Sequence, residues 1–237
     1  MKSNETICIA WAHTGTVDTQ FALDMITIVK KRKQVTNYFC VNGTGLLAKS
    51  RNLLVKNFLD NTKDDWLLML DDDESIPLES FDELVKAASQ DRRVVAGLYF
   101  AALWNDNNLR PVPLIFHLDE THSVVPYDNY PKNAIFEIVA AGTGCLLIHR
   151  SVLVEMQKQF EGTMGPDWAW FQDGPIGNNK WLSEDLMFCS RLNSMGIKIY
   201  ANTAAKLGHH KSMWVTEDVY NYWEAANQAG TGLDALR

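Results

Sequence analysis

The sequence has 237 residues and a net charge of −7 at neutral pH, and 46% of its residues are hydrophobic. This composition is typical of a globular protein with one full hydrophobic core, and it excludes fibrous and largely disordered chains. The negative charge argues against a protein that coats DNA through its general charge, because such binding needs clustered Lys and Arg side chains. A basic run at 30–33 is interpreted as a helix end, where cations are favourable.

The four cysteines are widely spaced and lie in apolar segments, at Cys8, Cys40, Cys145 and Cys189. No pair has the spacing of a zinc site or a redox motif, so we expect free thiols in a reducing compartment. No signal peptide is evident, and the longest mostly apolar run, 136–148, is too short to span a bilayer. The sequence therefore predicts a cytoplasmic protein, located in the host cytoplasm if a virus encodes it.

Strand-like and helix-like patterns alternate along the chain, which predicts an α/β fold. The first half is expected to hold strands at 6–12, 37–41, 66–70 and 94–100, and helices at 19–31, 46–59 and 81–89. The second half is expected to hold strands at 114–117, 136–148 and 198–201, and helices at 151–160, 183–195 and 216–229. Residues 105–132 and 162–180 are rich in turn-forming residues and are expected to form long loops.

The most informative segment is WLLMLDDDESIP, in which an apolar strand runs directly into Asp71, Asp72, Asp73 and Glu74. Side chains alternate along a strand, so Asp71 and Asp73 are expected to point the same way. Two converging carboxylates repel each other unless a cation lies between them, and Mg²⁺ or Mn²⁺ prefers oxygen ligands. Open α/β sheets also bind ligands at the carboxyl ends of their strands. A solvated acidic turn is the alternative, and the abrupt junction of strand and carboxylates favours metal binding.

This arrangement resembles the Asp-x-Asp motif of glycosyltransferases with the GT-A fold, especially family-2-like and compact virus-encoded members. The resemblance runs in element order from about residue 6 to about residue 211. It implies a Rossmann-like nucleotide-binding fold, with a mixed sheet flanked by helices, and we expect a single domain over 1–237. Residues 1–100 are then expected to bind a nucleotide sugar, and residues 101–237 to bind the acceptor and carry out catalysis.

The resemblance assigns roles to the acidic motif. The first aspartate of such a motif contacts the ribose or a metal-bound water, and the last binds the ion that holds the donor diphosphate. These roles fall on Asp71 and Asp73, which are both expected to hold the ion, with Asp72 in the donor site. A C-terminal histidine often completes the ligands of the ion, and His209 fits that position, although a histidine is more commonly a structural or surface residue. A mixed Asp and His set favours Mn²⁺ over Mg²⁺.

Arg51 lies on the apolar face of its predicted helix and therefore needs an anionic partner. An internal ion pair, for example with an aspartate of the triplet, explains it as well as the nucleotide contact that the resemblance implies for Arg51 and Asn52. Thr14 and Gly15 follow the first predicted strand, in a small polar turn. The residues alone indicate only a strand-to-helix connection there, and the resemblance implies a pocket for uracil or guanine.

Gly142 and Gly144 lie within a predicted strand, where glycine marks a bulge or the close approach of a ligand or backbone. The resemblance implies that they lie beside the transferred sugar. Ser183, Glu184 and Asp185 open a predicted helix, and on the residues alone they form an N-cap with an acidic first turn. The resemblance implies instead that the acidic pair supplies the catalytic base, with Asp185 favoured and Glu184 as its rival or as an acceptor-binding group.

The predicted reaction is a single displacement with inversion, in which Asp185 takes a proton from an acceptor hydroxyl that attacks the anomeric carbon of a UDP-sugar or related donor. A greater distance between the acidic pair and the anomeric carbon would favour a retaining mechanism. Trp168, Trp170 and Trp181 are candidates for stacking on the acceptor, and a small aromatic core explains them equally well. The acceptor is open among a glycan, a lipid, a protein and a hydroxymethylated DNA base.

Two alternatives come from other functional classes. The segment LMLDDDES also resembles the signature of haloacid-dehalogenase-like phosphohydrolases, with Asp71 as nucleophile. That motif normally lies near the N-terminus, however, and no clear downstream Lys and acidic pair follows it in order. The other alternative is a non-catalytic protein that binds a nucleotide sugar or a glycan, which only activity would separate from the enzyme.

Overall fold

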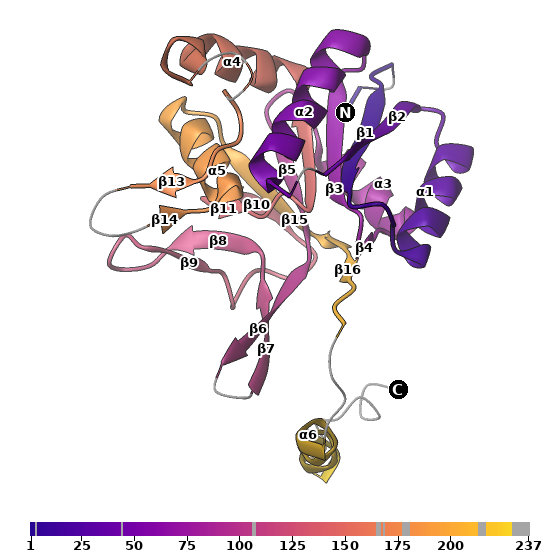
Figure 1. The fold of residues 1–237 in the computed structure, drawn as a ribbon, viewed down its shortest axis with the longest axis vertical. Helices are drawn as coiled ribbons and strands as arrows, with labels where there is room; N and C mark the ends of the chain where they lie inside the picture. Colours follow the sequence, from indigo (N-terminus) through magenta and orange to yellow (C-terminus); the bar gives the residue numbers. More distant parts are fainter. Residues whose placement is uncertain are drawn as a thin grey trace.

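A seven-stranded mixed sheet forms the centre of the computed structural model, which describes residues 1–2, 4–43, 45–105, 108–164, 167, 169–176, 181–212 and 217–228. The strands lie in the order β10-β15-β5-β12-β3-β1-β2 (Figure 1). Strand β1 is parallel to β2 and β3, and β12 runs antiparallel between β3 and β5. The predicted α/β fold is therefore confirmed. The strand bounds are β1 (Ile7–His13), β2 (Val35–Asn42), β3 (Trp66–Asp71), β5 (Val94–Leu98), β10 (Ile135–Ile138), β12 (Cys145–His149) and β15 (Ile199–Lys206).

Helices cover both faces of this sheet (Figure 1). One face packs against α1 (Thr19–Lys31) and α3 (Leu78–Ala87), and the other against α2 (Leu47–Asn61), α4 (Arg150–Met164) and α5 (Glu184–Ser194). Because side chains alternate along a strand, β3 contributes to both cores, with Leu67 and Met69 on the α2 side and Leu68 and Leu70 on the α1 side. Burial on both faces explains the unbroken apolar run before the acidic triplet.

Helix α1 has the bounds expected from the sequence. Asp18 is its N-cap and accepts a hydrogen bond from the backbone N–H of Gln20. Phe21, Met25 and Ile28 form its buried face, and its last turn is basic. The cations at 30–31 therefore lie at a helix C-terminus, as the sequence indicated.

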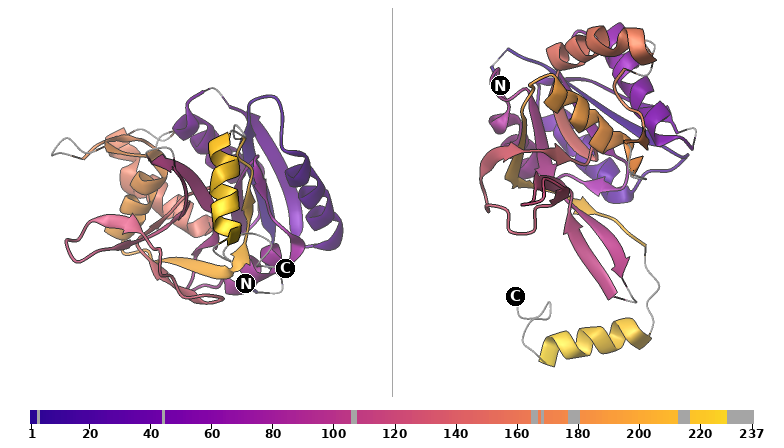
Figure 2. Two further views of the ribbon diagram at one scale, coloured as in Figure 1. Left: turned by 90° about the horizontal axis from the view of Figure 1, so that it is seen from below. Right: turned by 90° about the vertical axis from the view of Figure 1, so that its left-hand side faces the viewer.

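Small sheets surround the central one. They comprise β4 (Glu74–Ser75) with β16 (Gly208–His209), the hairpin of β6 (Phe100–Asn105) and β7 (Asn108–Pro113), the strands β8 (Ile115–Leu118), β9 (Val124–Pro126) and β11 (Ala140–Ala141), and the pair β13 (Gly174–Pro175) and β14 (Trp181–Leu182). The hairpin projects from the body, and α6 (Glu217–Gln228) lies apart from the sheet (Figure 2). No helix in the part of the chain that the structure describes is long and apolar enough to cross a membrane.

The single strand predicted over 136–148 is wrong, because this segment forms three separate strands. Strand β10 pairs with β15, β11 leaves the central sheet to pair with β8, and β12 returns between β3 and β5. The strand predicted at 114–117 is present as β8, and the long loops expected around it at 105–132 also contain β7 and β9.

Two pairings place the functional residues. Ala12 at the end of β1 lies opposite Asp71 at the end of β3, so the carboxyl ends of these parallel strands share one edge of the sheet. At the same edge, the short antiparallel pair β4–β16 places His209 opposite Glu74. The fold thus joins the acidic segment to the C-terminal histidine.

Candidate functional site

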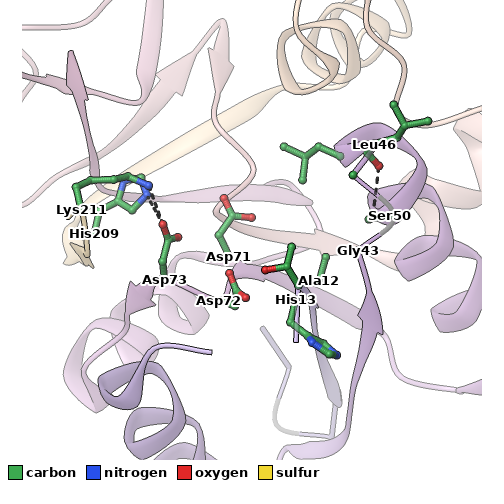
Figure 3. Close-up of a pocket in the computed structure, with 13 residues that line it drawn as sticks. Ala12, His13, Gly43, Leu46, Ser50, Asp71, Asp72, Asp73, His209 and Lys211 are labelled. Carbon is green, nitrogen blue, oxygen red and sulfur yellow. Dashed lines mark hydrogen bonds and ion pairs between the residues drawn. The ribbon is translucent and has the colours of Figure 1, made fainter. Parts of the chain in front are cut away.

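A hollow of about 380 Å³ opens where β1, β2 and β3 end (Figure 3). Such a volume suits a small-molecule ligand. The acidic triplet lies on one side and Gly43, Leu46 and Ser50 lie on the other, and Thr14 also lines the hollow. The structure therefore brings Thr14 and the triplet to one hollow. Gly15 lies next to its rim, with φ at +112°, and its N–H donates to His13 Nδ1 over 3.0 Å.

Asp73, Glu74 and His209 form a compact group, in which candidate ligand atoms of all three lie within 4.8 Å of one another. His209 Nδ1 lies 2.8 Å from the carbonyl oxygen of Phe100. Because a carbonyl oxygen can only accept, Nδ1 carries the hydrogen of this bond. In the neutral ring Nε2 then has a free lone pair, and it lies 3.4 Å from Asp73 Oδ2. This arrangement presents a nitrogen and a carboxylate oxygen to a shared cation.

Glu74 is fully buried, and within the described residues neither of its carboxylate oxygens has a hydrogen-bond partner. The ring of His209 lies close to it, with Nδ1 3.6 Å from Oε1. Burial, together with the charges of Asp71 and Asp73, raises the pKa of Glu74 to about 9. A buried carboxyl without a partner is costly unless a cation or a proton compensates it. The residues present therefore fit a divalent cation.

The pKa of Asp73 is shifted in the opposite direction to that of Glu74. Burial disfavours its charged form, but hydrogen bonds and charge from His209, when its ring is protonated at Nε2 as well as at Nδ1, and from Lys211 outweigh burial and lower the pKa of Asp73 to about 2. Lys211 Nζ lies 2.7 Å from Asp73 Oδ2 (Figure 3). Asp73 is thus held as an anion beside two groups from the segment around β16.

Asp71 belongs to a different cluster at the other end of the triplet. Its Oδ1 lies 3.2 Å from Nη2 of Arg51, a side chain from α2 that is only 4% exposed, and the other guanidinium nitrogen of Arg51 pairs with Glu184. Burial raises the pKa of Glu184, and the charge of Arg51 opposes that shift. Of the two interpretations of Arg51, the structure contains the internal ion pair. It also brings Glu184 of α5 to the triplet.

The side chain of Asn52 is hydrogen-bonded to backbone groups of two segments. Its side-chain amide donates to the carbonyl oxygens of Ala48 and Phe171 over 2.8 and 2.6 Å, and its oxygen accepts from the N–H of Phe171 over 3.0 Å. The side chain is buried, so in this structure it fastens the loop around Phe171 to α2 and leaves no free group for a nucleotide.

The two glycines near β12 lie against Tyr99, a buried residue that sequence reasoning missed. The N–H of Gly144 donates to the Tyr99 hydroxyl over 2.9 Å. A Cβ atom on Gly142 would overlap that hydroxyl, and one on Gly144 would lie 2.9 Å from Asp71 Oδ2. The close approach expected from these glycines is present, and the approaching groups are Tyr99 and Asp71.

The predicted acceptor residues separate into buried and exposed groups. Trp170 is 1% exposed and donates from Nε1 to the carbonyl oxygen of Leu153, so it belongs to the core and cannot stack on an acceptor here. Trp181 is 64% exposed, and its Nε1 donates to Asp173 Oδ2 over 3.2 Å. Trp168 lies outside the described residues.

Asp185 lies in the first turn of α5, directly after Glu184. Its Oδ1 accepts from the hydroxyl of Ser183, the N-cap residue, and from the N–H of Leu186. Asp185 also adds to the negative field around Arg51, so it lies near the Arg51–Asp71–Glu184 cluster without being one of its ion-pair partners.

Solved structures with this arrangement of strands and helices identify the fold. A197 from STIV aligns over 89% of this chain and 97% of its own, with a TM-score of 0.52 and 16% identity. GalNAc-T7 with UDP, GalNAc and Mn²⁺ aligns over 94% of this chain, with a TM-score of 0.57 and 13% identity. The fold is GT-A-like. This chain spans 48% of the GalNAc-T7 chain. No protein-family model and no curated protein sequence matches the chain.

The GT-A-like fold that the resemblance implied is therefore confirmed. It also accounts for the position of the hollow, because open α/β sheets bind ligands beyond the carboxyl ends of their strands. Besides Tyr99, the charged residues Glu74 and Lys211 were not among the predicted site residues. Glu74 directly follows the triplet and was a visible signal, whereas nothing in the pattern around Lys211 distinguishes it from other surface lysines.

Proposed function

We propose that this protein is a metal-dependent glycosyltransferase that moves a sugar from a nucleotide-diphosphate sugar, with a UDP-sugar favoured, to an acceptor hydroxyl. The observation that carries the proposal is the buried, uncompensated carboxyl of Glu74 beside Asp73 and His209, at one side of the hollow. The GT-A-like fold supports the class of reaction. The structure of GalNAc-T7 with UDP and Mn²⁺ supports the choice of donor and ion.

Asp73 and His209 would hold the ion, with Glu74 adding negative charge from the buried side and Asp71 lying at the edge of the same acidic wall. A mixed set of carboxylate and imidazole ligands favours Mn²⁺ over Mg²⁺. A divalent ion bound there supplies positive charge to the diphosphate leaving group. We place the nucleobase near Thr14, which lines the same hollow, and near Gly15, which follows it in the chain, with Asp72 as a further donor contact.

Asp185 is the proposed base, with transfer by inversion. Glu184 is held by Arg51 in an ion pair, whereas Asp185 has only its N-terminal helix contacts. A carboxylate that is not held by a guanidinium is better placed to accept a proton from an acceptor hydroxyl. Arg51 then serves as a positioning residue that fixes Asp71 and Glu184 relative to each other. Trp181 is the one predicted tryptophan whose described side chain is exposed enough to bind an acceptor.

A panel of nucleotide sugars tests this proposal. Thermal unfolding is measured with UDP-, GDP- and TDP-sugars, each with and without Mn²⁺, in the natural protein and in Asp73→Asn. We expect one nucleotide class to raise the midpoint temperature only when Mn²⁺ is present, because ligands that bind the native state stabilise it. Asp73→Asn should abolish that Mn²⁺-dependent rise. A panel in which no nucleotide sugar stabilises the natural protein contradicts the proposal.

Product analysis separates the remaining alternatives. Incubation with the stabilising donor and a mixture of glycan acceptors should release the nucleoside diphosphate and yield a glycosylated product. Binding without release would favour the non-catalytic interpretation. Release of inorganic phosphate from phosphate monoesters, lost in Asp71→Asn, would favour the phosphohydrolase, for which the ion pair of Asp71 with buried Arg51 gives no support.

A further inference from the structure

Lys211 contacts the carboxylate oxygen of Asp73 to which the proposed ion would bind. Its Nζ lies 2.7 Å from Asp73 Oδ2, and Nε2 of His209 lies 3.4 Å from that same atom. The N–H of His210 donates to the carbonyl oxygen of Asp73 over 2.9 Å, which fastens the backbone beside Lys211 to the acidic loop. Lys211 is therefore positioned against Asp73 by the chain on which it lies.

An ammonium group and a divalent ion cannot both lie in close contact with one carboxylate oxygen without strong mutual repulsion. We propose that Lys211 is an internal counter-ion of Asp73, which the divalent ion displaces when it binds, and that the released ammonium then pairs with the phosphate groups of the donor. This inference rests on the proposed function, since it assigns Lys211 a role at the same site.

The environment of Lys211 supports both parts of this exchange. The side chains of Lys211 and Asp73 are 44% and 35% exposed, so the ion pair is accessible and can open without disturbing the core. Lys211 also lines the hollow together with Asp71, Asp72 and Asp73. Lysine is a compact charge on a flexible stem, which allows the ammonium to move within the hollow. Because the ion and the donor each favour the displaced position of Lys211, their binding is coupled in both directions.

Lys211→Met tests the counter-ion role, because it should raise the affinity for Mn²⁺ and lower the affinity for UDP. Mn²⁺ binding is measured without nucleotide by the loss of the free-ion electron paramagnetic resonance signal. We expect affinity to rise roughly threefold, because a half-exposed competing ion pair has been removed. Affinity for UDP, measured by calorimetry at saturating Mn²⁺, should fall roughly tenfold, because a charge-assisted contact has been lost.

Two variants control the comparison. Lys211→Arg keeps the positive charge and should hold both affinities near those of the natural protein. Lys206→Met removes an exposed lysine that does not line the hollow, and it should change neither affinity. Circular dichroism of each variant checks that the fold is retained.

The outcomes distinguish this inference from the proposed function. If the natural protein binds Mn²⁺ and UDP but Lys211→Met binds Mn²⁺ no more tightly, the counter-ion role is wrong and the glycosyltransferase proposal stands. If Mn²⁺ binds more tightly while the affinity for UDP is unchanged, the contact with the donor is wrong. If the natural protein binds neither ligand, the proposed function is itself contradicted.

Discussion

The two ends of the acidic triplet differ in how their charge is compensated. Asp71 is paired with Arg51, a buried side chain that is also held by Glu184. Asp73 faces His209 and the half-exposed Lys211. A guanidinium fixed between two carboxylates is a permanent part of the fold, whereas an accessible ammonium can be exchanged for another cation. We infer that the first aspartate organises the site and the third binds the ion.

Asp185→Asn should have the largest effect of the variants considered, and the quantity it changes is the turnover rate. Loss of a general base typically lowers the turnover rate by about a hundredfold to ten-thousandfold. The donor affinity should change little, because Asp185 is not an ion-pair partner of Arg51. Initial rates of donor consumption, with calorimetry on the same samples, measure both quantities. The matched variant Glu184→Gln should weaken the link to Arg51 and lower the rate less, and the reverse order would make Glu184 the base.

Arg51→Met tests whether the ion pairs at the Asp71 end of the triplet stabilise the fold. Removing one member of a buried ion pair leaves its partners uncompensated, so we expect the free energy of unfolding to fall by about 3 kcal/mol or more. Urea denaturation provides the measurement. Arg32→Met is the matched control, because Arg32 pairs with Asp82 at a more exposed position. We expect that control to lose much less stability, because exposed ion pairs contribute little, and equal losses in the two variants would contradict a structural role for Arg51.

Asp73→Asn and Asp71→Asn compare the two ends directly. We expect Asp73→Asn to weaken Mn²⁺ binding by roughly thirtyfold, a loss within the range for altered metal surroundings. Asp71→Asn should weaken it by only about threefold, since Asp71 is outside the compact group of Asp73, Glu74 and His209. Paramagnetic resonance of free Mn²⁺ without nucleotide measures both. Comparable losses would mean that Asp71 is also a direct ligand, as the resemblance implied.

The sequence was sufficient where local patterns determine the structure. The apolar run of β3 predicted a strand buried on both faces, and its end fixed the position of Asp71. Helix α1 begins after an N-capping aspartate and ends at two lysines, which is why its bounds were predicted correctly. The α/β fold followed from the order of these elements, and its GT-A-like form was implied by the family resemblance of the acidic motif.

The rest of the site depends on contacts that leave no periodic signal. Strands β4 and β16 have two residues each, too few for an alternating pattern, yet their pairing places Glu74 beside His209. The burial of Trp170 is likewise a property of the packed loop, and its sequence neighbours gave no basis for separating it from Trp181. Whether a polar or aromatic residue in a loop faces a core or a ligand is set by tertiary packing.

Glu74→Gln tests the ion-binding end of the triplet through the pH dependence of stability. The pKa of Glu74 is raised from an ordinary value of 4.5 to about 9, so between these pH values the unfolded chain loses a proton that the folded chain keeps. The stability of the natural protein should therefore fall as pH rises, by about 1 kcal/mol per pH unit relative to a variant without this titration. Urea denaturation of both proteins at pH 6, 7 and 8, with a chelator present, measures the difference.

Added Mn²⁺ should reduce the slope of the natural protein, because a bound cation favours the charged carboxyl. Parallel stability curves for the two proteins in the chelator would mean that Glu74 titrates normally and that no cation is needed to compensate it.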